Sequence, residues 1–137
     1  MATLITGGCM CGAVRYECSA EPMMSANCYC KDCQRSSGGA LASVLVVPKE
    51  AFKLTKGEPK HYEVTADSGN KVSRGFCTNC GSPILSLLTG MPNVVAIKAG
   101  SLDDPASFKP AANVYMASAP AWAPVRTDLR RFEKMPS

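Results

Sequence analysis

Long apolar runs and export signals are both absent from this chain of 137 residues. No apolar stretch approaches the roughly 20 residues that a membrane-spanning helix needs. The N-terminal segment, MATLITGGCMCGAV, lacks the basic stretch and following apolar run of a secretory signal. We therefore expect a soluble protein of the cytoplasm with no membrane partner.

Strong net charge is absent as well. The chain has 15 Lys and Arg residues and 11 Asp and Glu residues, which gives a formal net charge of +4. The densest basic cluster is only Arg126, Arg130 and Arg131, whereas nucleic-acid-binding proteins more often carry a basic run interleaved with aromatic residues. We interpret this cluster as a solvated surface and expect no nucleic-acid partner.

Histidine is nearly absent, since His61 is the only one. It lies in the strand-like segment KHYEVT, where a half-exposed strand position is the simplest interpretation. The chain therefore has no evident general base of the usual type. This absence argues against ordinary metal-assisted hydrolysis.

The chain is 46% hydrophobic, which excludes intrinsic disorder and suffices for one core at this length. We expect a single domain over residues 1–137, mostly β, because strand-sized apolar runs alternate with turn signals such as KGEP, DSGN and TGMPN. Strands are predicted at 12–18, 40–47, 61–65, 71–76, 84–88 and 94–99, and helical turns at 31–37 and 103–108. Trp122 and the prolines around it are predicted to cover a core or the edge of a pocket.

Eight cysteines are the dominant feature of the composition. They make up about 6% of the chain, below the roughly 8–10% of short disulfide scaffolds, so metal binding is the better interpretation and a disulfide network the alternative. Seven fall into three tight groups, and Cys18 stands apart in an alternating strand pattern that predicts a small buried hydrophobe. The three groups are Cys9 with Cys11; Cys28 with Cys30 and Cys33; and Cys77 with Cys80.

The first and last groups are predicted to share one structural zinc ion. Zinc prefers about four ligands at roughly 2.3 Å from sulfur, so two sulfurs from one short loop require a sharply bent backbone. Glycines that can adopt positive φ flank both pairs, at 7, 8, 12 and 81. A site built from Cys9, Cys11, Cys77 and Cys80 would join the beginning of the chain to its middle. Four buried, inert thiols are the alternative.

The middle group offers three sulfurs within six residues and no obvious fourth ligand. Catalytic zinc commonly has three protein ligands and an open position, whereas structural zinc is closed by four. We therefore predict an exchangeable zinc ion on Cys28, Cys30 and Cys33. Closure of the site by Cys18, His61 or Asp32 is one alternative, and oxidation of the thiols to a disulfide is another.

The chain resembles the glutathione-dependent formaldehyde-activating enzyme (GFA) family, which includes centromere-protein-V-like domains. The segments GGCMCGAVRYEC, NCYCKDCQRSSGG, KGEPKHY, SRGFCTNCGSPI and APAW carry this resemblance over residues 7–124. It implies an antiparallel, β-tent-like fold with Cys9, Cys11, Cys77 and Cys80 on a structural zinc and Cys28, Cys30 and Cys33 on a second zinc near the substrate. Tyr29 and Asn113 stand where family members often have histidine, so a different substrate is left open.

The resemblance further implies a carbon–sulfur lyase that adds the thiol of glutathione to formaldehyde, giving S-hydroxymethylglutathione. Cys28, Cys30 and Cys33 would be the catalytic group. Arg35 and Arg74 lie next to the ligand segments and are candidates to bind a carboxylate of glutathione, with surface arginines as the alternative. Two rival functions remain: a non-catalytic, zinc-stabilised binding module, and an enzyme acting on another thiol adduct.

Overall fold

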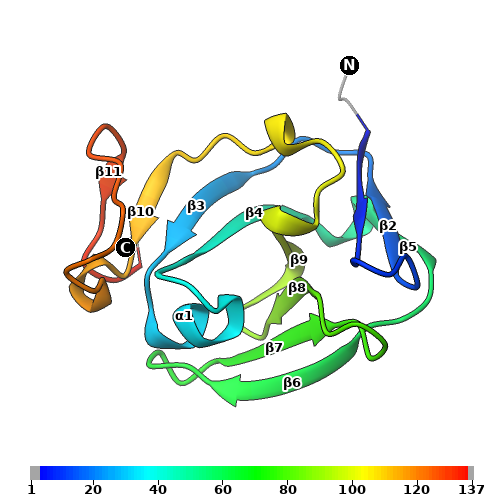
Figure 1. The fold of residues 1–137 in the computed structure, drawn as a ribbon, viewed down its shortest axis with the longest axis horizontal. Helices are drawn as coiled ribbons and strands as arrows, with labels where there is room; N and C mark the ends of the chain where they lie inside the picture. Colours follow the sequence, from blue (N-terminus) through cyan, green and yellow to red (C-terminus); the bar gives the residue numbers. More distant parts are fainter. Residues whose placement is uncertain (1–3, 136–137) are drawn as a thin grey trace.

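The computed structural model describes residues 4–135, whose strands form two sheets. The smaller sheet is antiparallel and has the strand order β1-β2-β5. Its strands are β1 (Ile5–Gly8), β2 (Arg15–Cys18) and β5 (Phe52–Lys56). In Figure 1 this sheet stands at the right of the molecule.

The larger sheet has the strand order β11-β10-β3-β4-β9-β8-β7-β6 and curves around the rest of the molecule (Figure 1). Its strands are β3 (Met24–Cys28), β4 (Ala42–Pro48), β6 (Lys60–Thr65), β7 (Lys71–Phe76), β8 (Pro83–Leu88), β9 (Met91–Lys98), β10 (Ala112–Val114) and β11 (Arg130–Arg131). Every neighbouring pair in the part β3-β4-β9-β8-β7-β6 of this sheet is antiparallel. Strand β10, by contrast, pairs in parallel with both β3 and β11. The predicted mostly antiparallel β fold is confirmed, with a short parallel edge.

The main core lies between the two sheets. Leu45 of β4 and Ile97 of β9 are register partners and are fully buried, as is Tyr16 of β2. The Tyr16 ring stacks on Phe52 with ring centroids 5.3 Å apart, and its hydroxyl is 2.6 Å from the Ser101 hydroxyl. Burial of this apolar surface is the main force that holds the smaller sheet against the larger one.

The helical predictions are confirmed in position. Helix α1 (Lys31–Ser37) ends at Gly38, whose φ of 77° lets its N–H donate to the carbonyl of Gln34. The second helical turn is a 3₁₀ turn, Pro105–Ser107, and the Asp104 side chain accepts a hydrogen bond from the Ala106 N–H at 3.0 Å.

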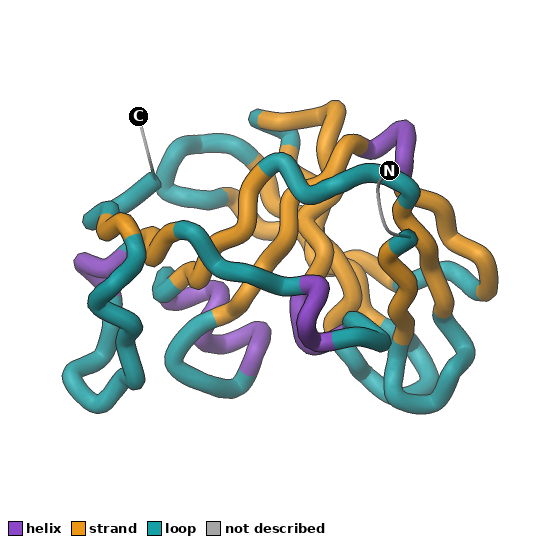
Figure 2. The backbone as a smooth tube through the Cα atoms, turned by 90° about the horizontal axis from the view of Figure 1, so that it is seen from above, coloured by secondary structure: helices purple, strands orange, loops and turns teal. Residues whose placement is uncertain are grey.

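Strands run through the middle of the molecule, and most of the loops and short helices lie at its periphery (Figure 2). Within residues 4–135, every helix is too short or too polar to serve as a membrane span. One expectation is wrong: Trp122 is 70% exposed and covers no core. It lies in a turn, and the nearby hydrogen bond from the Tyr29 hydroxyl is accepted by the Pro124 carbonyl at 3.2 Å.

Candidate metal centres and active site

Two tight turns bring four cysteines together. Cys9 and Cys11 lie in the connection between β1 and β2, and Cys77 and Cys80 lie in the connection between β7 and β8. Their four Sγ atoms all lie within 4.8 Å of one another. The fold therefore brings the first and last cysteine pairs together, as the sequence predicted.

The spacing of these sulfurs fits a tetrahedral metal site. The Cys9 and Cys11 Sγ atoms are 3.7 Å apart, and those of Cys11 and Cys77 are 3.8 Å apart. A tetrahedron with metal–sulfur bonds of roughly 2.3 Å has edges of about 3.8 Å, whereas a disulfide bond is only about 2.05 Å long. All eight cysteines are free thiols, which contradicts the disulfide-network alternative.

Several hydrogen-bond donors contact the sulfurs of the first group. The Val14 N–H donates to Cys9 Sγ at 3.2 Å, and the Asn79 side-chain amide donates to Cys11 Sγ at 3.2 Å. Hydrogen bonds from Ser82 lower the pKa of Cys80 to about 5. Metal ions bind thiolates rather than thiols, so the environment of Cys80 favours the form of this side chain that binds a metal ion.

The glycines around the first group have two different roles. Gly12 and Gly81 have φ values of 80° and 79°, so they supply the predicted left-handed bends. Gly7 and Gly8 do not, because they belong to β1. At Gly7 a Cβ would collide with the Ser101 carbonyl oxygen and the Tyr16 hydroxyl, so glycine is needed there for close packing.

The second group forms where β3 passes into α1. Cys28 is the last residue of β3, Cys30 caps α1, and Cys33 lies in the first turn of the helix. The Cys33 N–H donates to Cys30 Sγ at 3.3 Å, and the three Sγ atoms lie within 4.8 Å of one another. Helical spacing places the cap residue and the residue three positions later on the same side of the helix, which explains why the sulfurs converge.

Without a metal ion, the three thiols share protons unequally. Hydrogen bonds from the Cys28 and Cys30 thiols, with smaller contributions from Lys98 and Arg74, lower the pKa of Cys33 to about 3. Hydrogen bonds with Cys30 and Cys33, together with burial, raise the pKa of Cys28 far above its ordinary value. Metal ions bind thiolates, so a metal ion bound by this group would displace its remaining protons.

Within residues 4–135, no fourth Cys, His, Asp or Glu joins this second group. Cys18 is fully buried in the main core, and its thiol points to the Ala20 carbonyl oxygen at 3.7 Å. His61 is exposed on β6. The interpretation of Cys18 as a small buried hydrophobe is confirmed, and closure of the site by Cys18, His61 or Asp32 is not observed.

The side chains at the two positions that differ from the family pattern form hydrogen bonds outside the second group. The Tyr29 hydroxyl donates to the Pro124 carbonyl at 3.2 Å, and the ring is buried. Asn113 accepts a hydrogen bond from Asn27 at 3.2 Å. Neighbouring strand residues face opposite sides of a sheet, so Asn27 and Asn113 lie on the face opposite Cys28.

Strand register places three cationic or polar side chains on the same face as Cys28. Cys28 pairs with Ala42, and two residues further along β4 Val44 pairs with Lys98. Continuing across the sheet, Ala96 pairs with Ser86, and Ser86 pairs with Arg74. Directly paired residues share a face, as do residues two positions apart. Cys28, Lys98, Ser86 and Arg74 therefore project from one face of the sheet.

The two predicted arginines occupy different surroundings. Arg74 is half-buried, and its Nε is buried without a hydrogen-bond partner. Arg35 is exposed on α1, two positions after Cys33. Lys98 and Ser86 were not foreseen from the sequence. Lys98 follows the apolar run Val94–Ile97, and a charged residue at the end of such a run is the signal that could have identified it.

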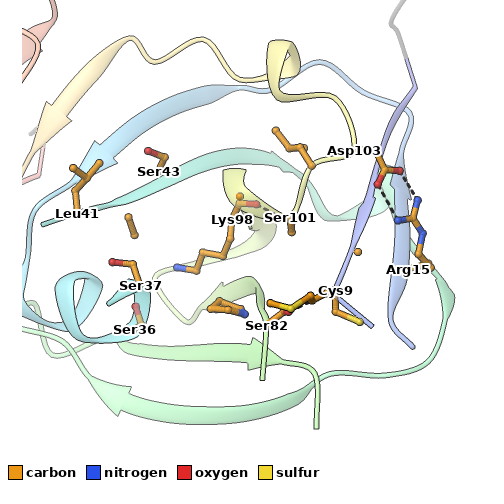
Figure 3. A pocket seen from close by; sticks show the side chains of 16 residues that line it. Cys9, Arg15, Ser36, Ser37, Leu41, Ser43, Ser82, Lys98, Ser101 and Asp103 are labelled. Carbon is orange, nitrogen blue, oxygen red and sulfur yellow. Dashed lines mark hydrogen bonds and ion pairs between the residues drawn. The ribbon is translucent and has the colours of Figure 1, made fainter. Parts of the chain in front are cut away.

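A cleft of about 610 Å³ lies between the first cysteine group and helix α1, and Cys28, Cys30 and Cys33 are not among the residues that line it. Cys9 and Ser82 line it on the side of the first group, and Ser36 and Ser37 of α1 line it on the other. Lys98 extends into the cleft with its amino group directed toward the α1 serines (Figure 3). A volume of several hundred Å³ is typical of small-molecule sites.

Residues 4–118 match the model of the family described as glutathione-dependent formaldehyde-activating enzyme (GFA). The chain belongs to the GFA family. The match includes all seven grouped cysteines, and it agrees with the resemblance found in the sequence motifs.

Two further comparisons place this GFA protein among known proteins. It is 25% identical over 130 residues to a Halomonas elongata protein provisionally named a glutathione-dependent formaldehyde-activating enzyme, covering 90% of this chain and 82% of that protein. Its fold is similar to the crystal structure of a Rhodobacter sphaeroides protein, with a TM-score of 0.58 and 20% identity over 72% of this chain and 87% of the other. The second similarity concerns the fold alone.

Proposed function

We propose that the protein is a zinc-dependent carbon–sulfur lyase that catalyses the addition of glutathione to formaldehyde. The observation that carries this proposal is the group of Cys28, Cys30 and Cys33, which offers three sulfurs and no fourth protein ligand among the described residues. Membership in the GFA family supports the substrate class. The first group supports a second zinc ion with a structural role.

The reaction needs a thiolate nucleophile and no redox change. Zinc bound to Cys28, Cys30 and Cys33 would supply acidity, because a metal ion lowers the pKa of a coordinated thiol. The glutathione sulfur then forms a bond to the formaldehyde carbon while the carbonyl π pair moves to oxygen. The proton that the thiol gave up returns to this oxygen, and the product is S-hydroxymethylglutathione.

We also propose Arg35 and Arg74 as candidates to bind a carboxylate of glutathione. Arg74 is the better candidate because it shares a sheet face with Cys28 and its Nε lacks a partner. Arg35 is the weaker candidate because it is exposed on α1. Comparing the glutathione affinities of Arg35→Gln and Arg74→Gln with wild type tests them separately. We expect a loss on the order of tenfold for Arg74→Gln, and unchanged affinity would remove either residue from the site.

The decisive experiment uses Cys30. Cys30→Ser keeps a hydroxyl that can cap α1, so it removes a sulfur ligand without removing the helix cap. We expect this variant to fold, to keep the ion of the first group, and to lose acceleration of S-hydroxymethylglutathione formation, measured by ¹³C NMR exchange with labelled formaldehyde. Cys18→Ala is the control, because it removes a cysteine that belongs to neither group.

The two rival functions give different results in this experiment. A wild-type protein that folds with two ions but neither accelerates the reaction nor binds glutathione would contradict the proposal and favour a binding module. Binding of glutathione without turnover of formaldehyde would favour action on another thiol adduct. The free state of all eight cysteines is what the reducing cytoplasm, the location proposed from the sequence, would maintain.

A further inference from the structure

Tyr115 has an unusual backbone conformation. Its φ of 58° and ψ of 38° lie in the left-handed region, and within residues 4–135 it is the one residue other than glycine with a positive φ. This region is disfavoured for L-residues because Cβ comes too close to the following carbonyl oxygen, and a bulky residue there is a clear outlier. Such strain persists only where the surrounding structure enforces it, and it is concentrated at functional sites.

Hydrogen bonds on both sides of Tyr115 hold this conformation. The Tyr115 N–H donates to the Lys134 carbonyl at 3.1 Å, and the Tyr115 carbonyl accepts from the Ser118 N–H at 3.0 Å. The side-chain amide of Gln34, on α1, donates to the Ser118 carbonyl at 3.0 Å. The turn that contains Tyr115 is therefore tied to the helix that carries Cys33.

The left-handed turn changes the side of the sheet that the Tyr115 ring faces. Val114, the last residue of β10, pairs with Cys28 and therefore shares its face. If the strand continued, the next side chain would project from the opposite face. Instead, the half-buried Tyr115 side chain packs against a hydrophobic cluster that includes Val114, Cys28 and Cys33. The ring therefore lies beside the second cysteine group.

The Tyr115 hydroxyl is a hydrogen-bond donor without a partner in the part of the chain that the structure describes, whereas the hydroxyls of Tyr16 and Tyr29 both have one. Its oxygen is not one of the fully buried atoms that lack a partner, so it is accessible. Burial and the nearby Cys28 and Cys30 raise the pKa of Tyr115, so the hydroxyl keeps its proton at neutral pH. An accessible, neutral donor thus stands next to the three sulfurs.

We propose that Tyr115 is a catalytic residue of the second site, and that its hydroxyl donates a hydrogen bond to the oxygen of the aldehyde that the thiol attacks. This inference rests on the proposed function, because it assigns a residue to that reaction. Negative charge moves from sulfur to this oxygen as the sulfur–carbon bond forms and the carbonyl π pair moves to oxygen. A donor fixed in advance stabilises that charge in the transition state more than it stabilises the reactants. The phenol keeps its own proton throughout.

Two small sulfur compounds test the hydrogen bond without requiring turnover. Thioacetate carries an oxygen on the carbon next to sulfur, as the aldehyde adduct does, and ethanethiol has the same skeleton without that oxygen. Both are titrated by isothermal calorimetry into zinc-loaded wild type and Tyr115→Phe, which keeps the ring and loses only the hydroxyl. The ratio of thioacetate affinity to ethanethiol affinity should fall on the order of tenfold in Tyr115→Phe, and ethanethiol affinity should stay unchanged. The two sulfurs differ in basicity equally for both proteins, so the change in the ratio isolates the hydroxyl.

The reaction gives a second readout. Formation of S-hydroxymethylglutathione by Tyr115→Phe should be slower by about tenfold or more, as expected when a donor to a developing oxyanion is removed. Glutathione affinity should not change, because the hydroxyl contacts the aldehyde oxygen and not the thiol. Tyr16→Phe is the matched control: it removes a hydroxyl in the main core that is bonded to Ser101, and it should leave the affinity ratio and the rate unchanged. Zinc content and far-UV circular dichroism confirm that each variant is folded and loaded.

Failure of this inference and failure of the proposed function give different results. An affinity ratio that is the same in Tyr115→Phe and wild type overturns the role of Tyr115, whatever the rate, and leaves the proposed function standing. Loss of zinc from Tyr115→Phe would show a structural role and would also overturn it. A tyrosine-dependent ratio in a wild-type protein that does not accelerate the addition of glutathione to formaldehyde supports the hydrogen bond and overturns the proposed reaction. If zinc-loaded wild type binds neither compound, both are overturned.

Discussion

The Sγ atoms of Cys11 and Cys77 lie 3.8 Å apart although 66 positions of the chain separate the two residues. Cys11 belongs to the hairpin of the smaller sheet, and Cys77 follows β7 of the larger one. A metal ion at this point would therefore link the two sheets. Closing a long loop removes chain entropy from the unfolded state, so the link should stabilise the fold strongly.

Removing one ligand of the first group should prevent stable folding. Structural zinc contributes roughly 10–16 kcal/mol of binding free energy in peptide models, which matches or exceeds the whole stability of most domains. We expect Cys77→Ser to lose that ion and to lack a cooperative thermal transition. Metal analysis and differential scanning calorimetry measure both. Cys18→Ala, which alters a buried cysteine outside the groups, should cost about 1 kcal/mol and keep every ion; equal behaviour of the two variants would contradict a structural site.

A chelator should distinguish the two groups. Four thiolates would close the first proposed zinc site, whereas the second group would supply three and leave a position open. Mild chelator treatment should therefore remove about one ion per chain while circular dichroism stays unchanged, and prolonged treatment should unfold the protein. Release of both ions in one step, or unfolding with the first, would show that the second site is structural as well.

Gly81 should be sensitive to substitution through its backbone conformation alone. It has a φ of 79°, and its N–H donates to the Cys77 carbonyl at 2.8 Å. A Cβ would meet no neighbour there, so the cost of Gly81→Ala is the left-handed backbone alone, about 1–2 kcal/mol. Gly100→Ala is the control, because Gly100 lacks a positive φ and also has open space around it. Chemical denaturation should show a lower free energy of unfolding for Gly81→Ala and little change for Gly100→Ala.

Asn113 should matter for stability and not for substrate binding. Its side chain accepts from Asn27 and donates to the Arg126 carbonyl at 2.8 Å, so Asn113→Ala leaves buried polar groups unpaired. We expect a loss of about 1–3 kcal/mol in unfolding free energy and unchanged glutathione affinity. Asn93→Ala, at an exposed position of β9, provides the comparison. Weakened glutathione binding in the Asn113 variant alone would mean that this sheet face contributes to the site.

The contribution of the Arg15–Asp103 ion pair to the free energy of unfolding should depend on pH. Hydrogen bonds from Arg15 and Thr6 lower the pKa of Asp103 from 3.8 to about 2. Because the folded-state pKa is the lower one, the contribution is fully present well above pH 3.8 and disappears as the pH falls through about 2. Both side chains are partly exposed, so we expect no more than about 1 kcal/mol.

Asp103→Asn tests this pair by urea denaturation at neutral and acidic pH. The free energy of unfolding of Asp103→Asn should be lower than that of wild type by a constant amount near neutral pH. This difference should shrink on acidification, because acid protonates the wild-type carboxyl. The comparison between the two proteins cancels any acid-induced loss of metal that both share. A deficit that grows on acidification would contradict the assignment.

Local sequence patterns predicted most of the strands and the position of α1. The strands at 71–76 and 84–88 carry the alternating or continuous apolar patterns that favour extended backbone, and they form as β7 and β8. By contrast, β3 has the sequence MSANC, which contains no β-branched residue. It forms a strand because β4 and β10 bind it on both edges, which is a tertiary cause that no local pattern displays.

The sequence by itself determined the cysteine groups, because their members lie two or three positions apart and glycines such as Gly12 and Gly81 permit the bends. It also determined the family, since the motifs are contiguous. Only the tertiary structure decided that Lys98 and Ser86 share a face with Cys28 and that Asn113 does not. The physical reason is register: a side chain's face depends on how distant strands align, and a shift of one residue would turn each of these groups to the other side of the sheet.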